Sequence, residues 1–193
     1  MKDNELWLIE QSRKGNVEAF EELIKEHKKS AYNIALRVLR NVEDAEDISQ
    51  EALIKVFKNI HNFNMQSTFR VWMYRIVVNA CLDFKRKKTI DAYSIDEPIK
   101  LDGNNEIHKE IEDNTNNPDA MIEKNFNSEM VNKAVNKLDD DFKTIIILRD
   151  IKGFSYQEIS EILSCNLGTV KSRLNRARSN LKQIIQEELK IQY

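Results

Sequence analysis

The stretch from Ser155 to Leu181, SYQEISEILSCNLGTVKSRLNRARSNL, decides how the rest of the chain is interpreted. Ser155 and Glu158 have the spacing of a capping box, in which each side chain accepts a hydrogen bond from the other residue's backbone amide. Residues 164–168 lack apolar periodicity and end in Gly, which predicts a tight connection between two helices. Apolar residues of the second helix then recur at helical spacing, at Val170, Leu174, Ala177 and Leu181.

Two short helices joined by a tight connection, with the second one polar and basic on its outer faces, are typical of a helix-turn-helix. One helix fits into the DNA major groove, where Arg and Lys reach guanine acceptors or phosphates. The same pattern fits an ordinary helical hairpin with a solvated charged face, so both interpretations stand at this point. The residues off the apolar stripe are Lys171, Ser172, Asn175, Arg176 and Arg178.

The composition predicts an all-α protein. The chain has 193 residues, of which 41% are hydrophobic and 32% charged, with only 4 Gly and 2 Pro. The formal net charge of -2 argues by itself against a nucleic-acid-binding protein, but the charge is unevenly distributed along the chain. No apolar run has the length of a transmembrane span, and the polar N-terminus lacks the apolar stretch of a signal peptide. We therefore expect a cytoplasmic protein without membrane insertion.

Residues that carry catalytic or metal chemistry are absent as a group. The sequence contains no Gly-rich phosphate loop, no His-Glu-x-x-His and no recognisable set of nucleophile, base and orienting group. We expect no enzymatic activity, no cofactor and no bound metal. Cys81 and Cys165 have no second Cys or His at ligand spacing, which predicts two free thiols, buried or half-buried.

The apolar periodicity before residue 90 predicts four helices, over residues 5–13, 17–40, 44–59 and 68–87. Gly15 is predicted to end the first helix, Asn16 to cap the second and Ser67 to cap the fourth. The fourth helix ends in the basic run Lys85–Lys88. Aromatic residues beside these cations can stack unpaired bases, whereas a solvated helix end is the simpler interpretation.

Acidic residues dominate from residue 91 to residue 119, where Pro98, Pro118 and Gly103 accompany sparse, aperiodic apolar residues. This composition predicts a flexible acidic linker over residues 91–117. Helical order restarts at Asn117-Pro118, an N-cap followed by Pro at the first helical position. The chain is therefore predicted to consist of two helical domains, residues 1–90 and 118–193, joined by that linker.

Five segments of the two predicted domains carry a resemblance to a known family. In the first domain they are residues 15–20 (GNVEAF), 44–51 (DAEDISQE) and 69–79 (FRVWMYRIVVN). In the second they are residues 148–159 (LRDIKGFSYQEI) and 168–178 (GTVKSRLNRAR). The first three resemble region 2, and the last two region 4, of the extracytoplasmic-function (ECF) group of the sigma-70 RNA polymerase sigma factors. Both blocks occur in the family's order, with the acidic segment between them.

The resemblance implies a transcription initiation factor that binds core RNA polymerase and directs it to promoters. It assigns core-polymerase binding to Asp44, Asp47, Ile48, Gln50 and Glu51. It assigns the melted minus-10 DNA to Phe63, Ser67, Trp72, Arg75, Asn79 and Arg86. It assigns the minus-35 duplex to Arg149, Thr169, Lys171, Ser172, Arg173, Asn175 and Arg176.

The resemblance also implies an anti-sigma factor as a partner. Packing between helices is an alternative role for Trp72. Two other functions are considered beside the sigma factor. One is a helix-turn-helix transcriptional regulator that acts without being a polymerase subunit, and the other is a helical interaction protein without a DNA role.

Overall fold

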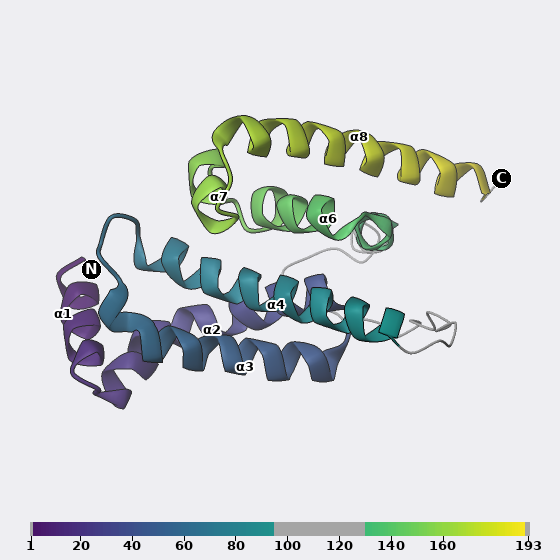
Figure 1. The fold of residues 1–193 in the computed structure, drawn as a ribbon. Coiled ribbons are helices and arrows are strands. Elements are labelled where there is room, and N and C mark those ends of the chain that lie inside the picture. The colour runs from purple at the N-terminus through teal and green to yellow at the C-terminus, as the bar shows by residue number, and fades with distance from the viewer. Residues whose placement is uncertain (1, 95–129, 192–193) are drawn as a thin grey trace, which may run out of the picture. The chain divides into compact units, whose positions relative to one another are not determined.

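The computed structural model describes residues 2–94 and 130–191, and every regular element in these ranges is a helix (Figure 1). The all-α prediction is therefore confirmed. The chain divides into two compact units. The N-terminal unit carries the helices up to residue 94, and the C-terminal unit carries those that follow residue 130. Residues 95–117 of the predicted linker lie outside the described residues.

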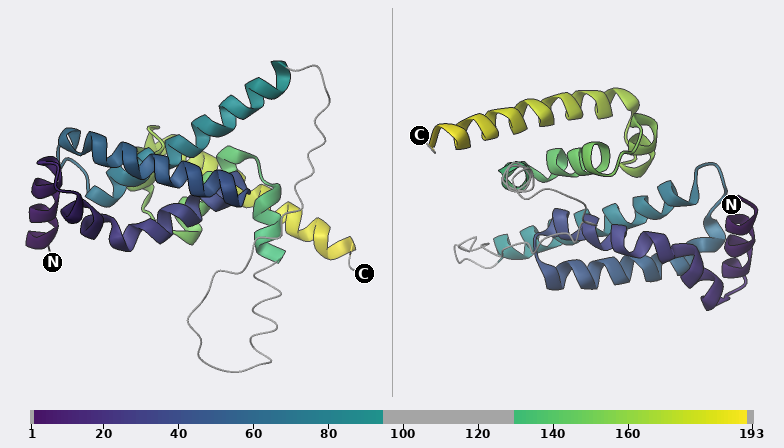
Figure 2. Two further views of the ribbon diagram at one scale, coloured as in Figure 1. Left: turned by 90° about the horizontal axis from the view of Figure 1, so that it is seen from below. Right: turned by 180° about the vertical axis from the view of Figure 1, so that it is seen from behind.

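The N-terminal unit consists of α1 (Lys2–Arg13), α2 (Val17–Leu39), α3 (Val42–Asn59), the 3-10 turn η1 (Ile60–Asn62) and α4 (Phe69–Ser94). Helices α2, α3 and α4 pack against one another, and α1 packs against α2 (Figures 1 and 2). Their shared core consists of small and branched side chains with no exposed surface, among them Ala31, Ile34, Ala35, Val38, Ala45, Ala52, Val56 and Val77.

Asparagine side chains cap two of these helices. The Asn16 Oδ1 accepts from the backbone N–H of Ala19 at 2.9 Å, which confirms the predicted cap of α2. The Asn41 Oδ1 accepts from the N–H of Asp44 at 2.8 Å, so the break predicted at this residue is the cap of α3. Each bond satisfies an amide that the helix itself leaves without a partner. Gly15 has a φ of 86°, a conformation suited to glycine, at the turn between α1 and α2.

Both ends of α4 differ from the prediction. Thr68, not Ser67, is the capping residue, because its Oγ1 accepts from the N–H of Val71 at 3.3 Å and its carbonyl accepts from Trp72 at 3.1 Å. At the other end the helix continues past Lys87 to Ser94. The basic run therefore lies inside the helix, where Lys85 donates to the carbonyl of Val38 at 3.4 Å.

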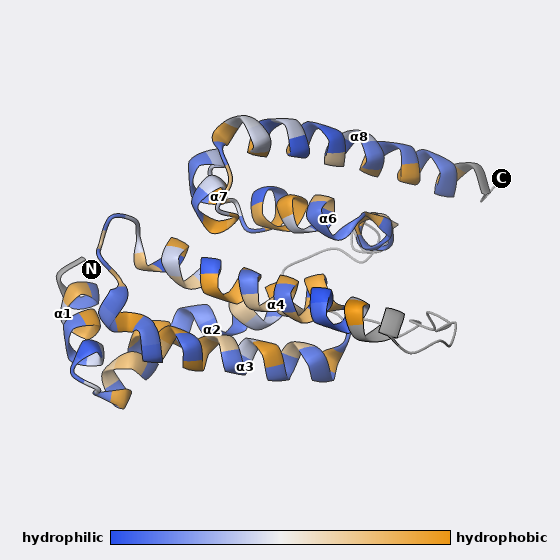
Figure 3. Ribbon diagram, viewed as in Figure 1, coloured by the Kyte–Doolittle hydropathy of each residue, from blue (hydrophilic) through white to orange (hydrophobic). Residues whose placement is uncertain are grey.

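The C-terminal unit consists of a helix that includes residues 130–137, α6 (Asp140–Ile146), the π-helical turn η2 (Ile147–Ile151), α7 (Tyr156–Ile162) and α8 (Leu167–Ile191). Helix α6 packs along α8. The apolar residues of α8 lie on the side toward α6, and its outer side is hydrophilic (Figure 3). Gly153, with a φ of 72°, lies just after η2.

The capping box predicted at the start of α7 is present. The N–H of Glu158 donates to the Ser155 Oγ at 3.2 Å, and the N–H of Ser155 donates to the Glu158 carboxylate at 2.7 Å. The connection to α8 is shorter than predicted, because α8 begins at Leu167 and Gly168 lies in its first turn. A Cβ at Gly168 would lie 3.3 Å from the Asn166 Oδ1, the atom that caps this helix.

Neither cysteine forms a disulfide, as predicted. Burial raises the pKa of Cys81 to about 12, so its thiol stays protonated. Among the described residues, no helix combines the length and the apolar composition needed to cross a lipid bilayer.

His27 is a titratable side chain in an aromatic environment of the N-terminal unit. Its ring lies against those of Phe69 and Tyr74, with centroids 6.4 Å and 6.0 Å away. Burial lowers the pKa of His27 from 6.5, and the charge of Arg70 acts in the same direction. The unfolded chain therefore takes up this proton at a higher pH than the folded chain does.

We predict that the contribution of His27 to stability is complete above about pH 6.5 and is lost as the pH falls through the lower folded pKa. Urea unfolding at pH 7.5 and pH 5.5 gives the free energy of unfolding at each pH. The difference between these two free energies should be smaller in His27→Gln than in the unchanged protein. His61→Gln, which removes an exposed histidine, is the matched control. An equal pH dependence in His27→Gln and the unchanged protein would contradict this prediction.

Candidate nucleic-acid and polymerase interfaces

The buried side of α8 fixes which of its residues face outward. Val170 and Ala177 are fully buried and Leu174 is 2% exposed, so this side packs against the unit. Residues about half a turn away must then face solvent. Those with exposed side chains are Lys171, Ser172, Asn175 and Arg176, four of the seven residues predicted to contact minus-35 DNA.

Two other arginines of α8 pair with acids of the same unit. The Arg173 Nη1 lies 3.5 Å from the Asp141 carboxylate. The Arg178 guanidinium makes two hydrogen bonds to the Asp150 carboxylate, one of them 3.2 Å long. This contact raises the pKa of Arg178. Both arginines thus connect α8 to neighbouring elements, whereas Lys171 and Arg176 make no such pair among the described residues.

Thr169 takes part in the cap of α8. Its N–H and its hydroxyl both donate to the Asn166 Oδ1, at 2.7 Å and 2.9 Å. The Ser172 hydroxyl in turn donates to the carbonyl of Thr169 at 3.1 Å. The predicted roles of Thr169 and Ser172 at DNA therefore coexist with local bonds that order the first turns of α8.

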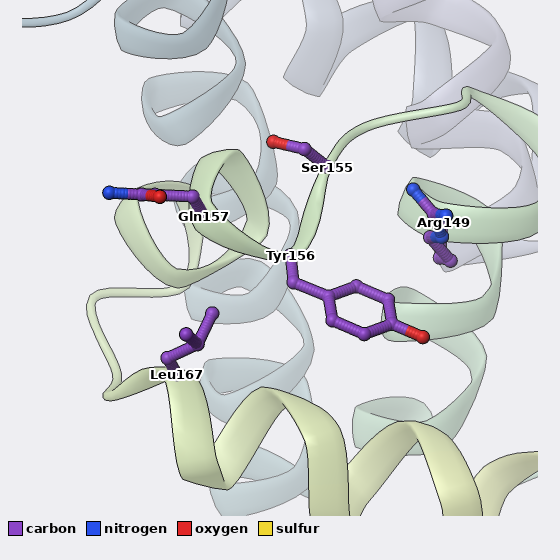
Figure 4. A pocket seen from close by; sticks show the side chains of 5 residues that line it. All are labelled: Arg149, Ser155, Tyr156, Gln157 and Leu167. Atoms are coloured by element: carbon purple, nitrogen blue, oxygen red, sulfur yellow. The ribbon is translucent and has the colours of Figure 1, made fainter.

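Arg149 lies on the π-helical turn η2 and faces the start of α7. Its Nη1 donates to the carbonyl of Phe154 at 2.8 Å, and its guanidinium lies 4.9 Å from the centre of the Tyr156 ring. Together with Ser155, Gln157 and Leu167, these two side chains line a shallow hollow of about 360 Å³ (Figure 4). The contacts hold Arg149 at the edge of the helix-turn-helix.

In the N-terminal unit, two aromatic residues predicted to meet minus-10 DNA are buried instead. Phe63 is 3% exposed and Trp72 is 7% exposed, with ring centroids 5.3 Å apart. Phe69 packs against both, at 5.9 Å and 6.0 Å. This arrangement favours the packing role that the sequence left open for Trp72, and it gives Phe63 the same role.

Polar residues on the outer side of α4 remain accessible. Arg75 and Asn79 are exposed and lie one helical turn apart. Arg86, further along, forms an ion pair with Asp83. In the basic run, Lys88 pairs with Asp44 at 3.1 Å and lies 5.7 Å from the centre of the Phe84 ring. Several cations of the basic run therefore bond to other residues of the same unit and are not free side chains beside a base-stacking surface.

The sequence pattern did not single out three exposed residues at the tip of the loop between η1 and α4. They are Asn64, Met65 and Gln66. Met65 has a φ of 60°, uncommon for a residue with a side chain. The Asn64 side chain accepts from the N–H of Gln66 at 3.2 Å and so tightens the turn. Ser67, which was predicted, is half-buried behind this tip. The polar, non-periodic stretch before α4 was the only signal available.

The five residues predicted to bind polymerase do not share one face of α3. Asp47, Gln50 and Glu51 are exposed and adjacent, but Ile48 is 7% exposed and belongs to the core. Asp44 is engaged with Lys88. Ile54, which was not predicted, is 53% exposed one turn beyond Gln50 and Glu51 and extends their face with an apolar side chain.

Comparison with known proteins places both units in one family. The Sigma-70 region 2 family model matches residues 23–90, and the Sigma-70 region 4 model matches residues 128–181. The ECF RNA polymerase sigma factor SigW of Bacillus subtilis is 35% identical over 179 residues, covering 93% of this chain and 95% of that protein. The ECF RNA polymerase sigma-E factor of Haemophilus influenzae is 31% identical, covering 93% and 94%.

A solved structure agrees with these sequence matches. The sigma factor RpoE of Bartonella quintana, determined in complex with the anti-sigma factor NepR, has a TM-score of 0.70 at 25% identity. The match covers 86% of this chain and 96% of that one. A regulator that acts apart from polymerase does not account for matches to both sigma-70 regions in their order. The chain belongs to the ECF sigma factors of the sigma-70 family and is a transcription initiation factor that directs RNA polymerase to promoters.

Proposed function

We propose that the two units divide promoter recognition between them. The outer face of α8 reads the minus-35 duplex, the outer side of α4 with the preceding loop holds unpaired minus-10 bases, and α3 binds core RNA polymerase. The observation that carries the proposal is the outer face of α8, where Lys171, Asn175 and Arg176 are exposed on a helix whose opposite side is buried.

The side chains on this face suit both parts of duplex recognition. Arg176 and Lys171 can donate to phosphates or to the acceptors of guanine, and Asn175 can pair with adenine. Arg173 and Arg178 hold the helix at its angle through Asp141 and Asp150. We therefore assign direct contact with the minus-35 bases to Lys171, Asn175 and Arg176, and a supporting role to Arg173.

We predict that Arg176→Ala weakens binding of the polymerase holoenzyme to minus-35 duplex by roughly 5- to 100-fold, since one good base contact is worth about 1–3 kcal/mol. Electrophoretic mobility shift at fixed salt measures the change. Arg173→Ala is the matched control, and we expect its effect to be smaller, at most about fivefold, because an exposed ion pair contributes at most about 1 kcal/mol. A larger loss in Arg173→Ala than in Arg176→Ala would reverse the assignment.

The minus-10 step uses α4 and the loop before it. Arg75 and Asn79 form an exposed pair on one side of α4, and the loop tip at residues 64–66 is exposed in the same unit. Bases that leave the duplex lose stacking and pairing, and contacts with such side chains offset that cost. The buried Phe63 and Trp72 support this surface from beneath instead of stacking on DNA.

We predict that Asn79→Ala impairs promoter melting while duplex binding is retained, because the amide contacts only a base that has left the duplex. Permanganate reactivity of minus-10 thymines in the open complex should fall by roughly 2- to 12-fold, corresponding to the loss of one neutral hydrogen bond of about 0.5–1.5 kcal/mol. Asn59→Ala, at the end of α3, is the control for loss of an exposed asparagine. Unchanged permanganate reactivity would refute the role of Asn79.

Core polymerase is the partner proposed for α3. The exposed face of α3 combines two carboxylates with an apolar side chain, a composition suited to a partly basic helical surface on the partner. Its residues are Asp47, Gln50, Glu51 and Ile54. Neither DNA-binding surface is large, so we infer that the polymerase holds both units at the separation of the two promoter elements.

We predict that Asp47→Lys lowers the affinity for core polymerase by about tenfold or more, since a like-charge contact at an interface costs several kcal/mol. Fluorescence anisotropy of the labelled chain with core polymerase measures the dissociation constant. Glu10→Lys makes the same charge change on α1 and should leave that constant unchanged. Equal effects of the two substitutions would exclude α3 as the specific docking face.

The remaining parts of the proposal concern regulation and location. Because RpoE of Bartonella quintana forms a complex with an anti-sigma factor, we propose that such a protein also holds this chain inactive. We place the protein in the cytoplasm, where promoter DNA and core polymerase meet. We propose that it acts by binding and positioning, without catalysis of its own. Residues 91–94 of the predicted linker belong to α4, and we propose that residues 95–117 link the two domains.

A further inference from the structure

Arg13, the last residue of α1, bonds to the segment that precedes α4. Its Nε donates to the carbonyl of Ile60 at 3.4 Å, and its Nη2 donates to the carbonyl of Phe63. These two carbonyls lie at the start of η1 and just after its end. One guanidinium therefore fixes both ends of the turn that leads into the loop.

The bonds from Arg13 add to other restraints on the same segment. The Phe63 ring is held by Phe69 and Trp72, and the Phe63 N–H bonds to the carbonyl of Ile60 at 3.1 Å. Beyond Phe63 the tip residues 64–66 are exposed, and Met65 has a φ of 60°. A residue other than glycine keeps such a left-handed backbone conformation only where its surroundings hold the backbone in place.

Besides Arg13, apolar side chains of α1 pack into the N-terminal unit. Ile9 is 2% exposed and Leu8 is 8% exposed, so the helix is anchored through its apolar side. The Ser12 hydroxyl bonds to the carbonyl of Leu8 at 2.7 Å, within the helix. The Sigma-70 region 2 match begins only at residue 23. Arg13 thus reaches the loop from a helix that precedes the matched segment.

We propose that Arg13 is a positioning residue for the capture of unpaired minus-10 bases. By donating to the Ile60 and Phe63 carbonyls it fixes the direction in which residues 64–66 leave η1, and so sets which base they accept. This inference rests on the proposed minus-10 role of the loop. Its first step, the ordering of the loop by Arg13, is a property of the free protein and can be measured apart from promoter recognition.

The first experiment measures amide hydrogen exchange at Phe63 and Gln66 in the free protein, because both amides are bonded in the ordered loop. We expect Arg13→Ala to speed their exchange by about tenfold or more, the effect of losing a hydrogen bond from a charged donor. Ser12→Ala, a change in the same helical turn, should leave them unchanged, and Arg13→Lys should restore part of the protection. Equal exchange in Arg13→Ala and the unchanged protein overturns the proposal.

The second experiment measures base selectivity as a ratio. Open-complex yield with core polymerase is compared between a cognate promoter and promoters carrying single minus-10 substitutions. This ratio does not depend on the fraction of folded protein, so a loss of stability alone leaves it unchanged. We expect Arg13→Ala to reduce it by about fivefold or more and Ser12→Ala to preserve it, because a small misplacement of contacting groups has a large effect on the reacting complex.

Faster exchange together with an unchanged ratio would overturn the role of Arg13 in selectivity. If the unchanged protein forms no open complex on any promoter with core polymerase, the proposed function fails instead. The exchange measurement would then still decide whether Arg13 orders the loop.

Discussion

Burial of one side of α8 is the constraint on which the C-terminal unit depends. Val170, Leu174 and Ala177 pack into the unit, and full burial of a side chain the size of Leu or Val contributes about 1.5–3 kcal/mol. Turning the helix by even a quarter turn would expose them and bury charged side chains. The packing of α8 therefore fixes its rotation, and in the proposed function this presents Lys171, Asn175 and Arg176 to a groove without a large entropic cost.

In the N-terminal unit, the surface that we propose for minus-10 DNA is supported in a different way. Phe63, Phe69 and Trp72 form a buried aromatic cluster between the loop and α4, and no exposed aromatic platform stands at these positions. The cluster ties the loop to the start of the helix, so that polar residues at the tip and on the outer side of α4 have a rigid support. Rigid support for a small set of contacts is what selective capture of a single base requires.

The local features of the fold were predictable from sequence because they depend on neighbouring residues. The capping box of Ser155 and Glu158 and the cap at Asn16 need only a spacing of three residues, and both are present. The assignment of Ser67 as a cap was wrong by one position, since Ser67 and Thr68 are chemically equivalent candidates.

The arrangement of the candidate site was less predictable because it depends on residues far apart in the chain. The sequence indicates that Arg173 and Lys88 lie on the surface, but it does not show their ion-pair partners. These partners, Asp141 and Asp44, are 32 and 44 residues away in the chain. Likewise, a motif places Ile48 among docking residues without showing that its side chain points into the core. Motif matching thus points to the segment that is proposed to bind, whereas packing decides which of its side chains are accessible.

The central claim is that this chain makes core polymerase promoter-specific, and run-off transcription from a pool of random promoters tests it most directly. We predict that adding the chain to core polymerase yields transcripts whose templates share two separated sequence elements, and that these transcripts vanish without the chain. Duplex DNA binding without any polymerase-dependent transcript would contradict the account.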